Sequence, residues 1–139
     1  SADEKTKGSM KGAEFGSADG LSFDHRGVLW IQTDVSSSTI NKKAYEGMGN
    51  NQMLATVPGT NEYRRFLTGP HGCEITGIAF TPDNRTLFIN IQHPGEPGDD
   101  ISDPANPTAV STWPDGDKNS RPRSSTVVIV KADGGVIGS

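Results

Sequence analysis

The chain has 139 residues, which is enough for one ordinary domain. Apolar residues make up 32% of it and aromatic residues 6%, a thin supply for an independent hydrophobic core. The formal net charge of −4 argues against a nucleic-acid partner, and the absence of a long apolar run argues against a membrane partner.

The predicted elements begin after residues 1–13, which are rich in Lys, Gly and Ser, show no periodicity and predict a flexible N-terminal segment. Apolar and β-branched runs bounded by turn residues then predict short strands. A long loop at 93–124 contains six prolines and is incompatible with regular structure. The predicted strands are 20–23, 28–33, 52–57, 62–67, 73–80, 86–92 and 125–131, with 136–138 as the start of a further one.

One β-hairpin pattern occurs twice. The first copy spans 20–32 and the second spans 77–90, an offset of about 57 residues that suits long β-propeller blades. In both copies a glycine begins the first strand and an apolar triplet forms the second. The matched residues are Gly20 with Gly77, Leu21 with Ile78, Phe23 with Phe80, Leu29 with Leu87, Trp30 with Phe88 and Ile31 with Ile89.

The repeat predicts an all-β fold of about two antiparallel blades of a β-propeller, over 14–139. One blade covers 14–69 and the other covers 70–139. Because propellers have about 4–8 blades and one blade cannot bury both of its faces, we expect a fragment of a larger ring. The remaining blades or self-association would then cover its open sheet faces.

Acidic residues lie at the start of the innermost strand in both repeats. Asp19 directly precedes Gly20, and Glu74 stands at the beginning of the strand that contains Gly77. In a propeller these strand starts point toward the central channel, where carboxylates from several blades suit hard cations. Spacing alone equally fits a turn cap at Asp19 and a solvated strand end at Glu74.

Two other residues are of types that can bind a ligand or a metal. His93, between a strand end and Pro94, suits either a ligand or phosphate contact or a hydrogen bond to the loop backbone. Cys73 is a soft ligand by type, but a buried small hydrophobe is the favoured interpretation. As the single cysteine, it excludes an intrachain disulfide and a cysteine zinc site.

Residues 72–83 (Gly-Cys-Glu-Ile-Thr-Gly-Ile-Ala-Phe-Thr-Pro-Asp) and 86–96, which contain Asn-Ile-Gln-His-Pro-Gly, carry a family resemblance. They resemble the C-terminal part of PhoX-type alkaline phosphatases, bacterial secreted enzymes formerly known only as a domain of unknown function. The resemblance continues in 18–24 and in 125–138. The segment 90–95 is its most specific part.

The resemblance implies a β-propeller whose central channel holds calcium and iron, and hydrolysis of phosphomonoesters with metals clamping the phosphate. It implies export by the twin-arginine route, to a periplasmic or secreted location. It favours Glu74 and Asp19 as metal ligands, with His93 as a further candidate. The family's iron-binding cysteine and phosphate-binding arginine have no match here, so we expect a metal-dependent phosphatase fragment that is inactive alone.

Two alternatives remain open. The first is a non-catalytic propeller segment that acts as a binding or scaffold module and holds at most structural calcium. The second is a lactonase-like calcium propeller enzyme, which also uses central carboxylates. Substrate profiling of the full protein distinguishes the second from the phosphatase.

Overall fold

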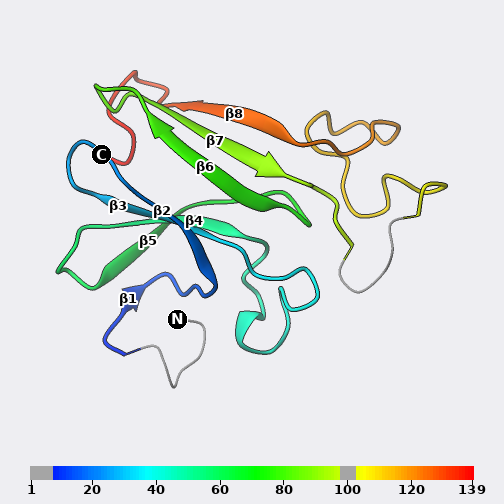
Figure 1. Cartoon of the computed structure of the whole chain (residues 1–139), viewed down its shortest axis with the longest axis horizontal. Helices are drawn as coiled ribbons and strands as arrows, with labels where there is room; N and C mark the ends of the chain where they lie inside the picture. The colour runs from blue at the N-terminus through cyan, green and yellow to red at the C-terminus, as the bar shows by residue number, and fades with distance from the viewer. Residues whose placement is uncertain (1–7, 98–102) are drawn as a thin grey trace.

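The computed structural model describes residues 8–97 and 103–139 (Figure 1). Strands and loops make up this part, with a single turn of 3₁₀ helix, η1 (Lys43–Tyr45), so the all-β prediction is confirmed. The strands are β1 (Lys11–Gly12), β2 (Ala18–Phe23), β3 (Leu29–Thr33), β4 (Gln52–Thr56), β5 (Glu62–Thr68), β6 (Glu74–Phe80), β7 (Thr86–Gln92) and β8 (Ser125–Val130).

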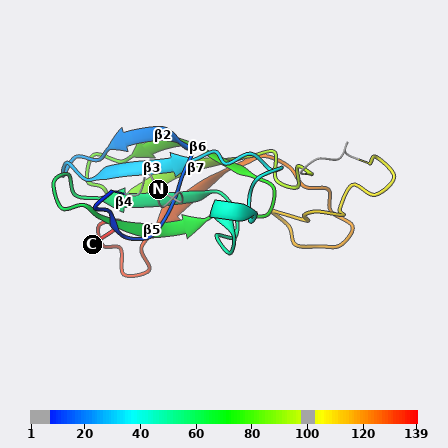
Figure 2. The same cartoon turned by 90° about the horizontal axis from the view of Figure 1, so that it is seen from below.

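The strands form two sheets. The first has the order β1-β5-β4-β3-β2 and the second has the order β6-β7-β8. Every pairing is antiparallel except that of β1 with β5, which is parallel. Both sheets contribute to one core cluster, and β2 and β3 of the first sheet lie against β6 of the second (Figures 1 and 2). The two sheets are therefore packed layers of one unit.

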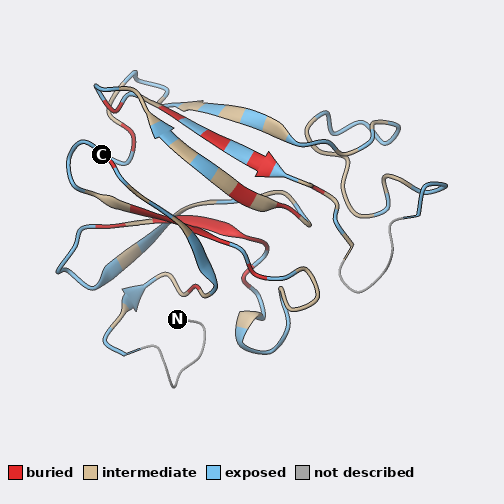
Figure 3. Cartoon of the chain, in the orientation of Figure 1, coloured by how far each residue is buried: buried red, intermediate tan, exposed pale blue. Residues whose placement is uncertain are grey.

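Alternation along the strands decides which side chains enter the core. In β7, Leu87, Ile89 and Ile91 are buried, whereas the residues between them are exposed. Buried and exposed segments alternate along β7 in Figure 3. The buried side chains belong to the same core cluster as Trp30 and Met53 of the first sheet, both of which are fully buried. Because successive strand residues point to opposite faces, the second sheet keeps one face in the core and leaves the other open.

The N-terminal segment covers part of the other face of the first sheet and leaves Leu21 and Phe23 of the edge strand β2 exposed. Phe15 packs there with Ile31 and Leu54 in a second, smaller cluster. The sequence did not predict β1, which lies within the residues expected to be flexible; residues 1–7 lie outside the described part. Gly12 approaches β5 so closely that a Cβ would lie 2.3 Å from the carbonyl oxygen of Tyr63. Glycine therefore permits this backbone pairing.

The repeated hairpin is present in both sheets. Each first strand carries a register shift, between Ala18 and Gly20 in β2 and between Thr76 and Ile78 in β6. An amide side chain of the second strand lies over the glycine in each hairpin. A Cβ on Gly20 would lie 2.5 Å from Gln32 Oε1, and one on Gly77 would lie 2.7 Å from Asn90 Nδ2.

The C-terminal residues are not a strand, contrary to the expectation for 136–138. Ile137 is buried, its amide donates to the carbonyl of Asn84 at 2.9 Å, and its carbonyl accepts from Arg26 Nη2 at 2.6 Å. Arg26 is in turn paired with the buried Asp24. The turns of the two hairpins therefore hold the backbone of this segment, which leaves it no strand partner.

Candidate functional site

Three carboxylates from different segments lie in the same region, at one end of the two sheets. Asp19 lies at the register shift of β2, Asp34 directly follows β3, and Glu74 begins β6. The start of β2 pairs with the end of β3, and β2 lies against β6. These contacts bring the three segments together. Asp19, Asp34, Glu74 and the adjacent His93 are called the acidic site below.

The charges of the other two carboxylates act on Glu74. Its side chain is only 13% exposed, and burial is the largest cause of its raised pKa. The negative charges of Asp34 and then Asp19 raise that pKa further, whereas His93 lowers it. The site therefore concentrates negative charge that a cation would neutralise.

His93 lies beside Glu74 at the end of β7. Its Nε2 is 3.7 Å from Glu74 Oε2, and its Nδ1 is 3.6 Å from Glu96 Oε2. Nδ1 is also 3.3 Å from the carbonyl oxygen of Gly72, and the backbone amide donates to Ser124 Oγ at 2.9 Å. The imidazole is thus fixed between a backbone carbonyl and two carboxylates.

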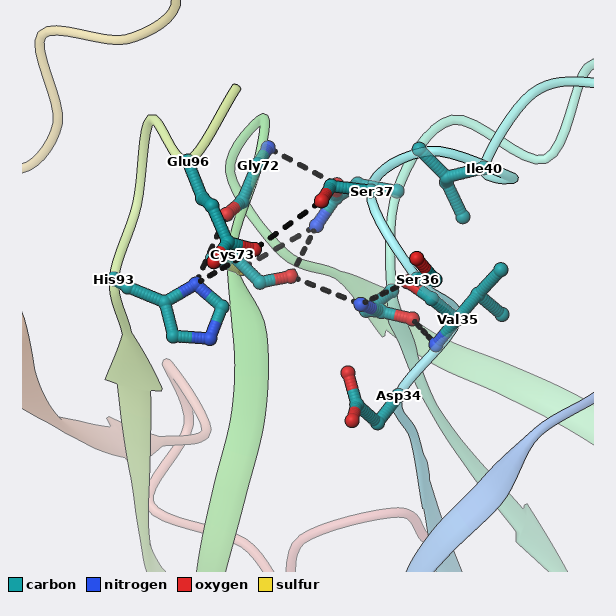
Figure 4. Close-up of a pocket in the computed structure, with 11 residues that line it drawn as sticks. Asp34, Val35, Ser36, Ser37, Ile40, Gly72, Cys73, His93 and Glu96 are labelled. Carbon is teal, nitrogen blue, oxygen red and sulfur yellow. Dashed lines mark hydrogen bonds and ion pairs between the residues drawn. The ribbon is translucent and has the colours of Figure 1, made fainter. Parts of the chain in front are cut away.

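A cavity of about 340 Å³ opens next to the acidic site (Figure 4). Asp34, Ser37, His93 and Glu96 line it from two loops. Ser37 Oγ donates to Glu96 Oε2 at 3.3 Å, so this hydrogen bond joins the loops. The cavity has a mostly polar wall, which suits a charged or hydroxylated ligand better than an apolar one.

Two buried asparagines hold the loops at the base of the cavity. Asn50 Nδ2 and Asn51 Nδ2 donate to the carbonyl of Cys73 at 2.9 and 3.0 Å. Asn51 Oδ1 also accepts from the amide of Val35 at 2.7 Å. Because these amides are engaged with the backbone, they position the loop that begins at Asp34 and the segment that leads into Glu74.

Cys73 behaves as a small hydrophobe, as its sequence context favoured. It is 1% exposed within the main core cluster. Burial raises the pKa of its thiol to about 12, so the thiol stays protonated at neutral pH. A protonated buried thiol does not fit the role of a metal ligand.

The predicted site residues lie in one region of the molecule, with one addition, and their role as metal ligands stays a prediction. Sequence analysis selected Asp19, Glu74 and His93 but missed Asp34, whose only sequence signal is its place directly after a strand. In the described residues no three His, Cys, Asp or Glu side chains converge closely enough to form a metal centre by themselves. The acidic site is at most part of a ligand set.

Comparison with known proteins places the chain in a family. The family model described as "Alkaline phosphatase PhoX" matches residues 1–95. This match covers more than half of the chain. The chain belongs to the PhoX family of alkaline phosphatases. All four residues of the acidic site lie in the matched stretch.

The PhoX family also provides a solved structure for comparison, PhoX from Pseudomonas fluorescens in complex with vanadate, a transition-state analogue. The two chains are 51% identical, with a TM-score of 0.74. The match covers 88% of the present chain but only 19% of the Pseudomonas PhoX chain. The present chain therefore spans about a fifth of the length of that PhoX protein.

Two further comparisons give negative findings. None of the curated proteins matches the chain. Within residues 8–97 and 103–139, no helix has the length and hydropathy needed to cross a membrane.

Proposed function

We propose that the chain is part of a metal-dependent PhoX phosphatase that hydrolyses phosphomonoesters. The observation that carries this proposal is the grouping of Asp19, Asp34 and Glu74 in one region beside a polar cavity, in a chain of the PhoX family. The vanadate bound by Pseudomonas fluorescens PhoX mimics a phosphoryl group in transfer and supports a phosphate ester as substrate. We propose further that the two sheets are neighbouring blades of a β-propeller and that the protein works in the periplasm or outside the cell.

The donor set fits calcium better than iron. Carboxylate oxygens are the ligands that calcium prefers. Burial is the main cause of the raised pKa of Glu74, and the negative charges of Asp34 and Asp19, which a cation would neutralise, raise it further. Asp19, Asp34 and Glu74 would each supply an oxygen, and the rest of the ligands would come from other parts of the protein. No residue described here suits iron specifically, because the Cys73 thiol is buried and protonated.

The residues of this chain have separable tasks in such an enzyme. The bound metals would supply electrostatic stabilisation of the phosphoryl group in the transition state. Glu74 and Asp34 hold negative charge at the wall of the site, and Asn51 holds the loop that begins at Asp34. His93 stands between the Glu74 carboxylate and the Gly72 carbonyl. The chain alone is proposed to be inactive because its ligand set is incomplete.

Replacing Glu74 with Gln is expected to weaken calcium binding by the 139-residue chain at least about tenfold. Glutamine keeps the shape but removes the charge that a hard cation seeks. Isothermal titration with CaCl₂ measures the affinity, which we expect on the order of 10⁻³ M for the wild-type chain because the set is partial. Glu46→Gln, a substitution in an exposed turn, is the matched control. Equal calcium affinity in all three proteins, or no binding by the wild type, would count against the metal assignment.

A further inference from the structure

Two exposed apolar faces lie on opposite sides of the pair of sheets. On the first sheet, Leu21 is 64% exposed and Phe23 is 62% exposed; these two residues are called the Phe23 face. On the second sheet, Phe88 is 38%, Val128 56% and Val130 62% exposed. Together with Asn90, these three form the Phe88 face. Exposed apolar groups gathered on a sheet face mark an interaction surface.

The chain itself shows how such faces dock. Where the first sheet packs on the second, the Trp30 ring contacts the Phe80 ring at a centroid distance of 5.3 Å. Beside this pair, Gln32 Nε2 donates to the carbonyl oxygen of Gly77 at 3.2 Å. The contact therefore combines an aromatic pair with a hydrogen bond from a side-chain amide to a glycine carbonyl.

The repeat relates the exposed faces to this buried contact. Phe88 and Asn90 in β7 occupy the places that Trp30 and Gln32 occupy in β3. Phe23 in β2 occupies the place of Phe80 in β6. Gly20 matches Gly77 in sequence, but Gly20 pairs in register with Gln32, whereas Gly77 lies at the register shift of β6, so the repeat carries over only the aromatic part of the contact. The Phe88 face thus corresponds to the face of the first sheet that packs on the second sheet. The Phe23 face corresponds to the face of the second sheet that receives it. The two exposed faces are complementary to each other rather than to themselves.

Asn90 matches Gln32 in the repeat, but its amide is turned the other way, because Gln32 places its Oε1 over Gly20 whereas Asn90 places its Nδ2 over Gly77. Its Oδ1 accepts a hydrogen bond from Thr126 Oγ1 at 2.8 Å, which orients the amide. Its Nδ2 lies over Gly77 and has no acceptor within the described part of the chain. A backbone carbonyl of a neighbouring sheet, within hydrogen-bond distance of Asn90 Nδ2, would satisfy this donor.

We propose that the 139-residue chain associates head to tail, with the Phe88 face of one copy docked on the Phe23 face of a second copy. Phe88 packs against Phe23 of the second copy, as Trp30 packs against Phe80 within the chain. Such a contact is heterologous, because different surfaces meet. The inference does not depend on the phosphatase proposal. In a longer protein, neighbouring sheets would occupy the same faces, so the association belongs to this chain alone.

The test is a mixing experiment by sedimentation-velocity ultracentrifugation. Phe23→Glu removes one face and Phe88→Glu removes the other, with Val128→Glu as a second variant of the Phe88 face. Val57→Glu is the matched control, because Val57 is 55% exposed but lies outside both faces. Far-UV circular dichroism selects the variants that are folded.

The wild type and Val57→Glu are expected to sediment at a multiple of the 14.7 kDa chain mass, and each face variant at the monomer mass. An equimolar mixture of Phe23→Glu with Phe88→Glu or Val128→Glu should form a dimer, because each partner retains one intact, complementary face. A monomeric wild type overturns the proposal. So does a mixture that stays monomeric, or a face variant that still self-associates, because both results fit contacts between identical faces instead.

Discussion

Replacing Trp30 with Ala is expected to lower the free energy of unfolding by about 3–5 kcal/mol, the usual cost of deleting a fully buried large aromatic side chain. Trp30 is 0% exposed and contacts Phe66 edge-on at 5.0 Å and Phe80 at 5.3 Å. It therefore joins the two sheets at their common core. Total stabilities of domains lie near 5–15 kcal/mol, so this loss would unfold a large share of the population at moderate temperature.

Urea unfolding followed by far-UV circular dichroism measures this effect without relying on tryptophan fluorescence. Trp113→Ala is the matched control, because Trp113 is only partly buried and lies in the long loop beside the core. We expect it to cost clearly less than Trp30→Ala. Equal costs at the two positions would show that Trp30 has no special part in joining the sheets.

Replacing Asp24 with Ala is expected to cost about 2–3 kcal/mol, because it strips hydrogen-bonded partners from a buried carboxylate site. Asp24 accepts hydrogen bonds from Arg26 Nη2 at 2.7 Å and from Trp30 Nε1 at 3.2 Å. Arg26 in turn holds the Ile137 carbonyl, so the substitution also loosens the C-terminal segment. Asp83→Ala, in the exposed turn of the second hairpin, is the control and should cost less.

The effect of Asp24 should depend on pH. Burial by itself raises the pKa of this carboxyl, but the hydrogen bonds from Arg26, Trp30 and the backbone amides of Arg26 and Val28 together lower it. A lowered pKa in the folded state means that ionised Asp24 stabilises the fold. This stabilisation is complete above the ordinary Asp pKa of about 3.9 and is lost as the pH falls through the lowered value. Unfolding midpoints of the wild type and Asp24→Ala should therefore converge in acid.

Period-two patterning made much of the fold predictable from sequence. Leu87, Ile89 and Ile91 alternate with exposed residues, and the structure places β7 where the pattern indicated. The match of Gly20 with Gly77 also has a physical basis, because each glycine makes room for an amide of its own hairpin. Local determinants of this kind are visible in the pattern of residue types along the sequence.

The parts that sequence analysis missed depend on contacts with distant backbone. β1 is paired through main-chain groups of Asn61 and Tyr63, and Lys11-Gly12 carries no strand pattern. The apolar pattern around Ile137 suggested a strand, but Asn84 and Arg26 bind its amide and carbonyl instead. The spacing of residues in the sequence does not predict these contacts.

In the candidate site, too, some residues were predictable from the sequence pattern and others depend on distant contacts. Asp19 and Glu74 were selected because the repeat placed them at equivalent strand starts. Asp34 belongs to a loop whose position is set by Asn51, and its contribution emerges only through the raised pKa of Glu74. His93 was selected with two interpretations, and the structure gives it both a backbone carbonyl at Gly72 and a carboxylate neighbour at Glu74.

The measurement that tests the central claim most directly is the turnover of p-nitrophenyl phosphate by a chimera. In it, the matching segment of Pseudomonas fluorescens PhoX is replaced by the present chain, which is 51% identical to that protein. We predict that the chimera with the wild-type segment turns over the ester with calcium and iron present. The Glu74→Gln chimera should lose at least about a hundredfold in kcat/KM, roughly 2.7 kcal/mol, at an unchanged Tm. Glu46→Gln should keep full activity. Full activity in a folded Glu74→Gln chimera would contradict the assignment of the acidic site to phosphate ester hydrolysis.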